Sequence, residues 1–114
     1  MTAITRKLFP FDEVAADSVR RVEVDEQEIA IVRIGDDVYA ISDICSHANV
    51  SLSQGWVDAA ERTIECPQHG AVFDVATGEA LCLPAVKPIP VYDVAVVDGV
   101  VTLTLGTGAA QVED

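Results

Sequence analysis

The chain of 114 residues is long enough for one domain with a modest core and too short for a second module. Its 7 basic and 19 acidic residues give a formal net charge of −12, which excludes a general nucleic-acid surface, because such a surface gathers Lys and Arg. No apolar run approaches the roughly 20 residues that a membrane-spanning helix needs. The N-terminal residues lack the apolar stretch of a secretory signal, so a cytoplasmic protein is expected.

The first half of the chain is patterned for short strands. Half of the residues are apolar but only 5% are aromatic, so Val, Ile, Ala and Leu must fill the interior, and β-branched residues favour strands. Residues 4–9 are expected to form an edge strand, with a short turn at 12–14 and a strand at 19–24. Residues 28–34 predict a partly buried strand, which Gly35-Asp36-Asp37 turns into a partner strand at 38–41.

The second half continues the pattern. A short strand is expected at 63–65, after a hairpin tip at 58–62, and residues 71–74 are expected to lead out of the loop that follows this strand, before a turn at Thr77-Gly78. Asp98-Gly99 is the strongest hairpin signal and joins strands at 92–97 and 100–105.

The predicted fold class is therefore all-β, with short antiparallel strands in a sandwich or small barrel. The pattern shows no long helix, repeat or linker. Residues 1–106 are expected to form the domain, and residues 107–114 an acidic, flexible C-terminal tail.

Two pairs of cysteine and histidine residues are the candidate metal ligands of the chain. The only two histidines each follow a cysteine closely, in Cys45-Ser-His47 and Cys66-Pro-Gln-His69, so the pattern is C-x-H-x18-C-x2-H. Zinc sites usually pair Cys with Cys and His with His. Here each loop offers one sulfur and one nitrogen, which suits a two-iron cluster with both cysteines on one iron and both histidines on the other. Rieske-type [2Fe–2S] clusters have this ligand set.

A longer stretch strengthens this interpretation. Residues 43–50 read D-I-C-S-H-A-N-V, residues 65–74 read E-C-P-Q-H-G-A-V-F-D, and residues 83–90 read L-P-A-V-K-P-I-P. This chain resembles the small Rieske ferredoxins that serve bacterial ring-hydroxylating oxygenases. The resemblance implies a Rieske domain with two cluster-binding loops and a proline loop, and one [2Fe–2S] cluster on Cys45, His47, Cys66 and His69.

The resemblance also implies a function. The protein would carry one electron from an NAD(P)H-dependent flavin reductase to a terminal non-haem iron oxygenase. It would be an electron-transfer component rather than an enzyme, and a monomer that binds neither nucleic acid nor membrane. The acidic excess could speed encounters with basic partner surfaces, or it could serve solubility alone.

Two features separate the chain from high-potential respiratory Rieske proteins. Those proteins carry a cysteine disulfide between the ligand loops, whereas Val50 and Gln68 stand at the matching positions here. They also offer Ser and Tyr hydroxyls to the cluster, whereas Ala71 and Phe73 stand here. Hydrogen bonds to cluster sulfur raise the reduction potential, so a potential near the low end of the range from about −150 to +300 mV is expected.

The sequence leaves other functions open. The small subunit of an assimilatory nitrite reductase resembles the same fold, and a Rieske protein linked to iron–sulfur assembly or redox sensing would have the same ligands. A structural zinc module is a further alternative. Trp56 is expected to pack in the core or against a loop, and Cys82 to be a small buried residue.

Overall fold

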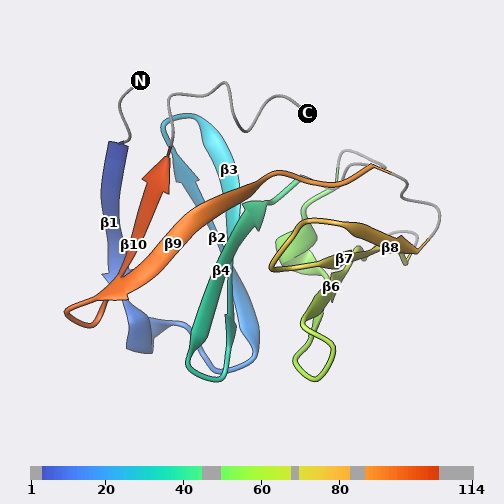
Figure 1. The fold of residues 1–114 in the computed structure, drawn as a ribbon, viewed down its shortest axis with the longest axis horizontal. Coiled ribbons are helices and arrows are strands. Elements are labelled where there is room, and N and C mark those ends of the chain that lie inside the picture. The colour runs from blue at the N-terminus through green and yellow to red at the C-terminus, as the bar shows by residue number, and fades with distance from the viewer. Residues whose placement is uncertain (1–3, 45–49, 68–69, 83–86, 106–114) are drawn as a thin grey trace.

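The computed structural model describes residues 4–44, 50–67, 70–82 and 87–105. These residues form two antiparallel sheets (Figure 1). The larger sheet has six strands in the order β1-β10-β9-β4-β3-β2, and the smaller has four in the order β5-β6-β7-β8. The predicted all-β class is confirmed.

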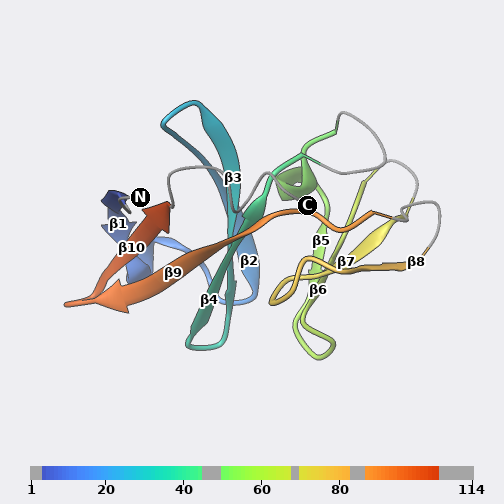
Figure 2. The same ribbon diagram turned by 45° about the horizontal axis from the view of Figure 1, so that its top comes forward.

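The strands of the larger sheet come from both ends of the described chain. They are β1 (Ile4–Pro10), β2 (Ser18–Val24), β3 (Gln27–Ile34), β4 (Asp37–Ser42), β9 (Val91–Val97) and β10 (Val100–Leu105). The smaller sheet is inserted between β4 and β9, and Figure 2 shows it beside the larger one. It comprises β5 (Trp56–Asp58), β6 (Thr63–Glu65), β7 (Val72–Asp74) and β8 (Ala80–Cys82).

The hairpins of the larger sheet confirm the predicted turns. Asp98 and Gly99 both have positive φ, at 53° and 77°, as a two-residue turn of the favoured hand requires. Gly35 likewise has φ of 59° between β3 and β4. The predicted edge strand is confirmed as β1, which pairs only with β10 within the described sheet.

Strand β3 is buried on both faces, more deeply than predicted. Ala30 and Val32 belong to a core that lies between the two sheets, whereas Ile29 and Ile31 belong to a second core within the larger sheet. A strand covered on both sides reads as a continuous apolar run rather than an alternation. The imperfect alternation of residues 28–34 has this cause.

The inter-sheet core attaches the smaller sheet to the larger. Its largest member is Phe73 of β7, and Ile64 of β6 and Leu52 lie in the same cluster. The second core holds Phe9, Val14, Val24, Ile29, Ile31, Ala40, Val101, Leu103 and Leu105. Each sheet therefore has apolar support, and the smaller sheet depends on the larger for one of its faces.

The short turn predicted at 12–14 is present as the 3-10 helix η1 (Phe11–Glu13). Three other short elements were not predicted: strands β5 and β8 and the 3-10 helix η2 (Leu52–Gln54), each of three residues. Three residues are too few to show a hydrophobic period. The predicted tip at 58–62 is confirmed as the turn between β5 and β6.

Candidate metal centre

One of the four predicted ligands lies in the described structure. Cys66 follows β6 directly, is wholly buried and forms no disulfide. Cys45, His47 and His69 lie outside the described residues, as does the segment 83–86 of the predicted proline loop. Within the described ranges, no three His, Cys, Asp or Glu side chains converge as metal ligands would.

A tight turn holds Cys66 between β6 and β7. Its backbone N–H donates to the carbonyl of Ala71 at 2.7 Å, and its own carbonyl accepts from the N–H of Gly70 at 3.3 Å. Gly70 has φ of 76°, a left-handed conformation that glycine adopts without steric cost. The second ligand loop therefore leaves and re-enters the smaller sheet at the position of Cys66.

The first ligand loop is closed at its base. Ile44 and Ser51 pair as an isolated antiparallel bridge, and the N–H of Leu52 donates to the carbonyl of Asp43 at 2.6 Å. These contacts bring together the two ends of the segment that contains Cys45 and His47. Leu52 then enters the inter-sheet core that also contains Cys66.

Gly55 places the exit of the first loop against the second. A Cβ built at Gly55 would overlap the carbonyl oxygen of Glu65 and lie 3.2 Å from Cδ of Pro67. The main chain after the first loop therefore passes directly beside the residues that flank Cys66. The two ligand loops start from adjacent positions, as ligands of a shared cluster require.

The end of the proline segment reaches the same region. The N–H of Ile89 donates to the carbonyl of Gly78 at 2.8 Å, and the N–H of Ser42 donates to the carbonyl of Pro90 at 2.9 Å. Ile89 is buried in the inter-sheet core. Residues 87–90 thus connect the end of β4, just before the first ligand loop, to the turn that follows β7.

A buried carboxylate anchors the first loop, which sequence reasoning missed. Asp43 is wholly buried, and its Oδ1 accepts the N–H of Ser53 at 2.8 Å. Its Oδ2 lies 3.3 Å from Nε of Arg21 on β2, but the pair is not aligned for a hydrogen bond. Arg21 also pairs with Glu28 at 3.1 Å, and this hydrogen bond is the main cause that raises the pKa of Arg21. The guanidinium therefore stays charged beside the buried carboxylate.

Removing this anchor is expected to destabilise the protein. In Asp43→Ala the N–H of Ser53 loses its acceptor and Arg21 loses a buried partner, so the free energy of unfolding should fall by about 1–3 kcal/mol. Asp37→Ala is the matched control, because Asp37 also pairs with an arginine, Arg62, but both side chains are exposed. An exposed pair contributes about 0–1 kcal/mol. Equal losses in chemical denaturation of the two variants would contradict the anchoring role of Asp43.

The surroundings of Cys66 fit an iron–sulfur cluster. The thiol is free, and apolar residues such as Ala71 and Phe73 surround it, so a bound cluster would lie in a dry environment on this side. Burial alone would also suit a cysteine that acts as a small hydrophobic residue. The mixed donor set of the two loops and the adjacency of their bases favour the cluster.

Comparison with known families supports the same conclusion. Residues 6–93 match the model of the Rieske [2Fe-2S] domain. The chain is 37% identical over 95 residues to the anthranilate 1,2-dioxygenase ferredoxin subunit of Burkholderia cepacia, which covers 83% of this chain and 86% of that protein.

Solved structures show the same relationship. The ferredoxin of carbazole 1,9a-dioxygenase from Nocardioides aromaticivorans IC177 superposes with a TM-score of 0.85 and 38% identity, over 87% of this chain and 95% of that one. A chain from a complex of reduced oxygenase and oxidized ferredoxin in carbazole 1,9a-dioxygenase has a TM-score of 0.82 and 37% identity, over 88% and 92% of the two chains. A putative nitrite reductase small subunit from Mycobacterium tuberculosis, at 19% identity, shares the fold, with a TM-score of 0.83 over 94% and 99% of the chains. Within the described residues, no helix is long and apolar enough to span a membrane.

Proposed function

The chain belongs to the Rieske [2Fe–2S] domain family, and we propose from this that Cys45, His47, Cys66 and His69 hold its cluster. The family membership gives the cofactor, one [2Fe–2S] cluster, which exchanges a single electron when bound. The observation that carries the assignment of ligands is the buried, free thiol of Cys66 beside the base of the first loop.

Each ligand would have a defined chemical form. Cys45 and Cys66 would bind one iron as thiolates, and His47 and His69 would bind the other through neutral ring nitrogens. The hydrogen bonds from Cys66 to Ala71 and from Gly70 to Cys66 would fix the second loop around its ligands. The bridge between Ile44 and Ser51 would do the same for the first loop.

Like its relatives from dioxygenase systems, the protein is an electron-transfer ferredoxin and not an enzyme in its own right. We propose that its donor is an NAD(P)H-dependent flavin reductase and its acceptor a terminal non-haem iron oxygenase. The solved complex of an oxygenase with a related ferredoxin supports the acceptor. We also propose that the protein acts as a cytoplasmic monomer, with residues 1–106 as the domain and 107–114 as a tail.

The alternatives have weaker support. The nitrite reductase subunit is similar in fold at 19% identity, whereas the two dioxygenase ferredoxins from Burkholderia cepacia and Nocardioides aromaticivorans are 37% and 38% identical to this chain. A role in iron–sulfur assembly or redox sensing would use the same cluster with other partners. A structural zinc module does not agree with membership of the Rieske family.

Reconstitution tests the proposed function. The purified protein should give the electron paramagnetic resonance spectrum of a Rieske centre after reduction. Combined with a flavin reductase and a terminal oxygenase from the same organism, it should be required for NAD(P)H-dependent oxygenation, and omission of the protein should stop turnover. A Rieske spectrum together with turnover that continues unchanged without the protein would disprove this electron route.

Added hydroxyls should raise the reduction potential. Ala71 and Phe73 are wholly buried beside Cys66, at the places where respiratory Rieske proteins offer hydroxyls. In Ala71→Ser and Phe73→Tyr, a new donor to cluster sulfur would stabilise the reduced state by about 1 kcal/mol, which corresponds to roughly 40 mV per hydroxyl. Protein-film voltammetry measures this shift. Val94→Thr adds a hydroxyl on β9, outside the inter-sheet core, and should leave the potential unchanged; a fall in either test variant would contradict the argument.

A further inference from the structure

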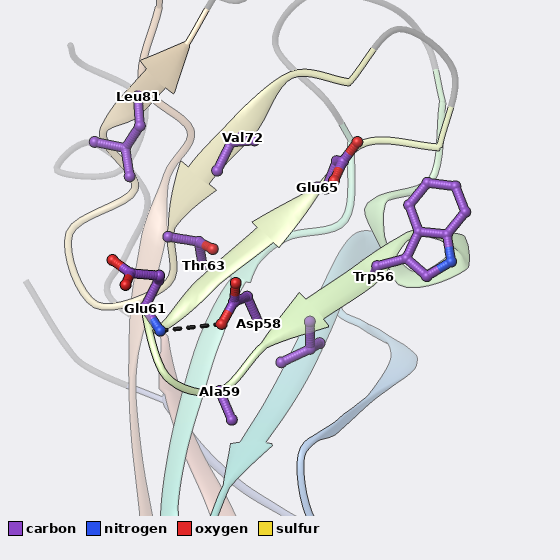
Figure 3. A pocket seen from close by; sticks show the side chains of 9 residues that line it. Trp56, Asp58, Ala59, Glu61, Thr63, Glu65, Val72 and Leu81 are labelled. Carbon is purple, nitrogen blue, oxygen red and sulfur yellow. Dashed lines mark hydrogen bonds between the residues drawn. The ribbon is translucent and has the colours of Figure 1, made fainter.

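The outer face of the smaller sheet combines exposed apolar side chains with carboxylates. Figure 3 shows this face, which holds an open groove of about 660 Å³. The residues that define the outer face are Trp56, Asp58, Glu61, Thr63, Glu65, Val72 and Leu81. The opposite face of the same sheet is covered, because Ile64 and Phe73 lie in the inter-sheet core.

Strand register explains why these residues share a face. Trp56 pairs with Glu65, and Glu65 pairs with Val72, so the three side chains lie side by side across β5, β6 and β7. Asp58 pairs with Thr63 one step further along. Cross-strand partners of an antiparallel sheet point to the same side.

The apolar part of the outer face is unusually open. Trp56, the only tryptophan of the chain, has 59% of its surface exposed, and Leu81 has 47%. Trp56 is therefore not a core residue, which was one of its two predicted positions. A single exposed apolar residue is ordinary, but a tryptophan and a leucine that line one groove resemble an interaction site. Tryptophan is among the residues that most often dominate binding energy at protein interfaces.

The charge of the outer face has one sign. Asp58, Glu61 and Glu65 line the groove, and no ion pair reaches any of them within the part of the chain that the structure describes. The only base of the β5–β6 hairpin, Arg62, instead bonds Asp37 and Tyr39 on the larger sheet, at 3.2 and 2.7 Å. The groove therefore presents negative charge around an apolar centre.

We propose that the outer face docks a protein partner that surrounds an apolar recess for Trp56 with Lys and Arg side chains. This inference rests on the proposed function, since the partner would be one of the two redox proteins. Glu65 directly precedes Cys66, so a partner seated here would lie beside the second ligand loop. A second copy of the chain suits the face poorly, because it carries the same carboxylates and a net charge of −12.

Mitochondrial cytochrome c is a suitable probe, because lysines surround its haem edge and it accepts one electron. A carbodiimide joins a carboxylate to a lysine amine as an amide only where the two touch, and takes up the elements of water to leave as a urea. After cross-linking of the oxidised proteins at low ionic strength, mass spectrometry should find the links at Asp58, Glu61 and Glu65. Links concentrated on the hairpin turns of the larger sheet would overturn the proposal, whatever the activity of the protein.

Electron transfer gives a second measurement. One electron leaves the reduced cluster and converts ferric haem to ferrous haem. In the triple variant Asp58→Asn, Glu61→Gln, Glu65→Gln, the bimolecular rate at low ionic strength should fall by about tenfold, and its dependence on salt should weaken. Trp56→Ala should lower the rate at both low and high salt, because an apolar contact is not screened.

A matched control distinguishes the effect of charges on the outer face from the effect of the net charge of the protein on the electron-transfer rate. The triple variant Glu26→Gln, Asp36→Asn, Asp98→Asn also removes three negative charges, but from exposed turns of the larger sheet. If this control loses as much rate as the test variant, the outer face is not a specific site. If the unaltered protein sediments as a dimer that Trp56→Ala dissociates, a second copy occupies the face and the proposal is wrong. An unaltered Rieske circular dichroism spectrum, together with NAD(P)H-dependent turnover in the reconstituted system, would show that the proposed function stands even where the docking inference fails.

Discussion

Cys66→Ser protein is expected to contain no Rieske cluster. Serine is a poor substitute for the thiolate that we propose holds iron, and the hydrogen bonds from Cys66 to Ala71 and from Gly70 to Cys66 hold the loop in its conformation. Metal binding is coupled to folding, so the melting temperature should also fall, by about 10 °C or more. Iron and sulfide analysis, visible circular dichroism and thermal denaturation measure these losses.

The other cysteines and histidines provide the controls for this variant. Cys45→Ser and His69→Ala should lose the cluster in the same way, because they stand in the same proposed ligand set. Cys82→Ser should keep a normal spectrum, since Cys82 lies on β8 and outside both ligand motifs. A normal Rieske spectrum from Cys66→Ser, or a lost spectrum from Cys82→Ser, would show that the ligands are wrongly assigned.

Gly55→Ala is expected to have the second-largest effect. Gly55 has φ of −93°, outside the left-handed region that favours glycine, so the loss is expected to come mainly from packing. The new Cβ would overlap the carbonyl of Glu65, and the main chain that leads into Cys66 would have to move. Overpacking of this kind costs about 1–3 kcal/mol of folding free energy, and the shift should also reduce cluster content after purification.

Gly35→Asn is the contrasting control for this substitution. Gly35 has φ of 59° in the β3–β4 turn, and nothing lies within 4 Å of an added Cβ. Asparagine tolerates this left-handed conformation, so stability should fall only slightly and the iron content should not change. A full cluster and unchanged stability in Gly55→Ala would contradict the close packing of the two ligand loops.

The sequence predicted the regular parts of the fold because their signals are local. Asp98-Gly99 specifies a tight turn by its own conformational preference, and the flanking strands are six or seven residues long. Strand β3 was predicted as partly buried, because no local pattern shows that the smaller sheet covers its second face. The exposure of Trp56 was not predicted for a related reason, since a three-residue strand does not reveal which side faces solvent.

The candidate site also combines features that the sequence predicted with features that depend on the folded structure. The spacing of cysteines and histidines predicted the cluster and the family, because ligand chemistry requires those residues at close intervals along the chain. The contact of Asp43 with Arg21 was not predictable, because Arg21 lies 22 residues before Asp43 and only the folded sheets bring the two together. The approach of Gly55 to Glu65 depends equally on how the two loops pack.

The presence of two separate cores has a consequence for the protein without its cofactor. The described residues of the second core lie within strands and turns of the larger sheet and include none of the proposed cluster ligands, whereas the inter-sheet core contains Cys66. Amide hydrogens of β3 and β10 should therefore exchange slowly with deuterium even in the apoprotein, and those of β6 and β7 quickly. In newly synthesised chains the larger sheet would then be ordered before iron and sulfide bind, while the smaller sheet would still be open enough to admit them.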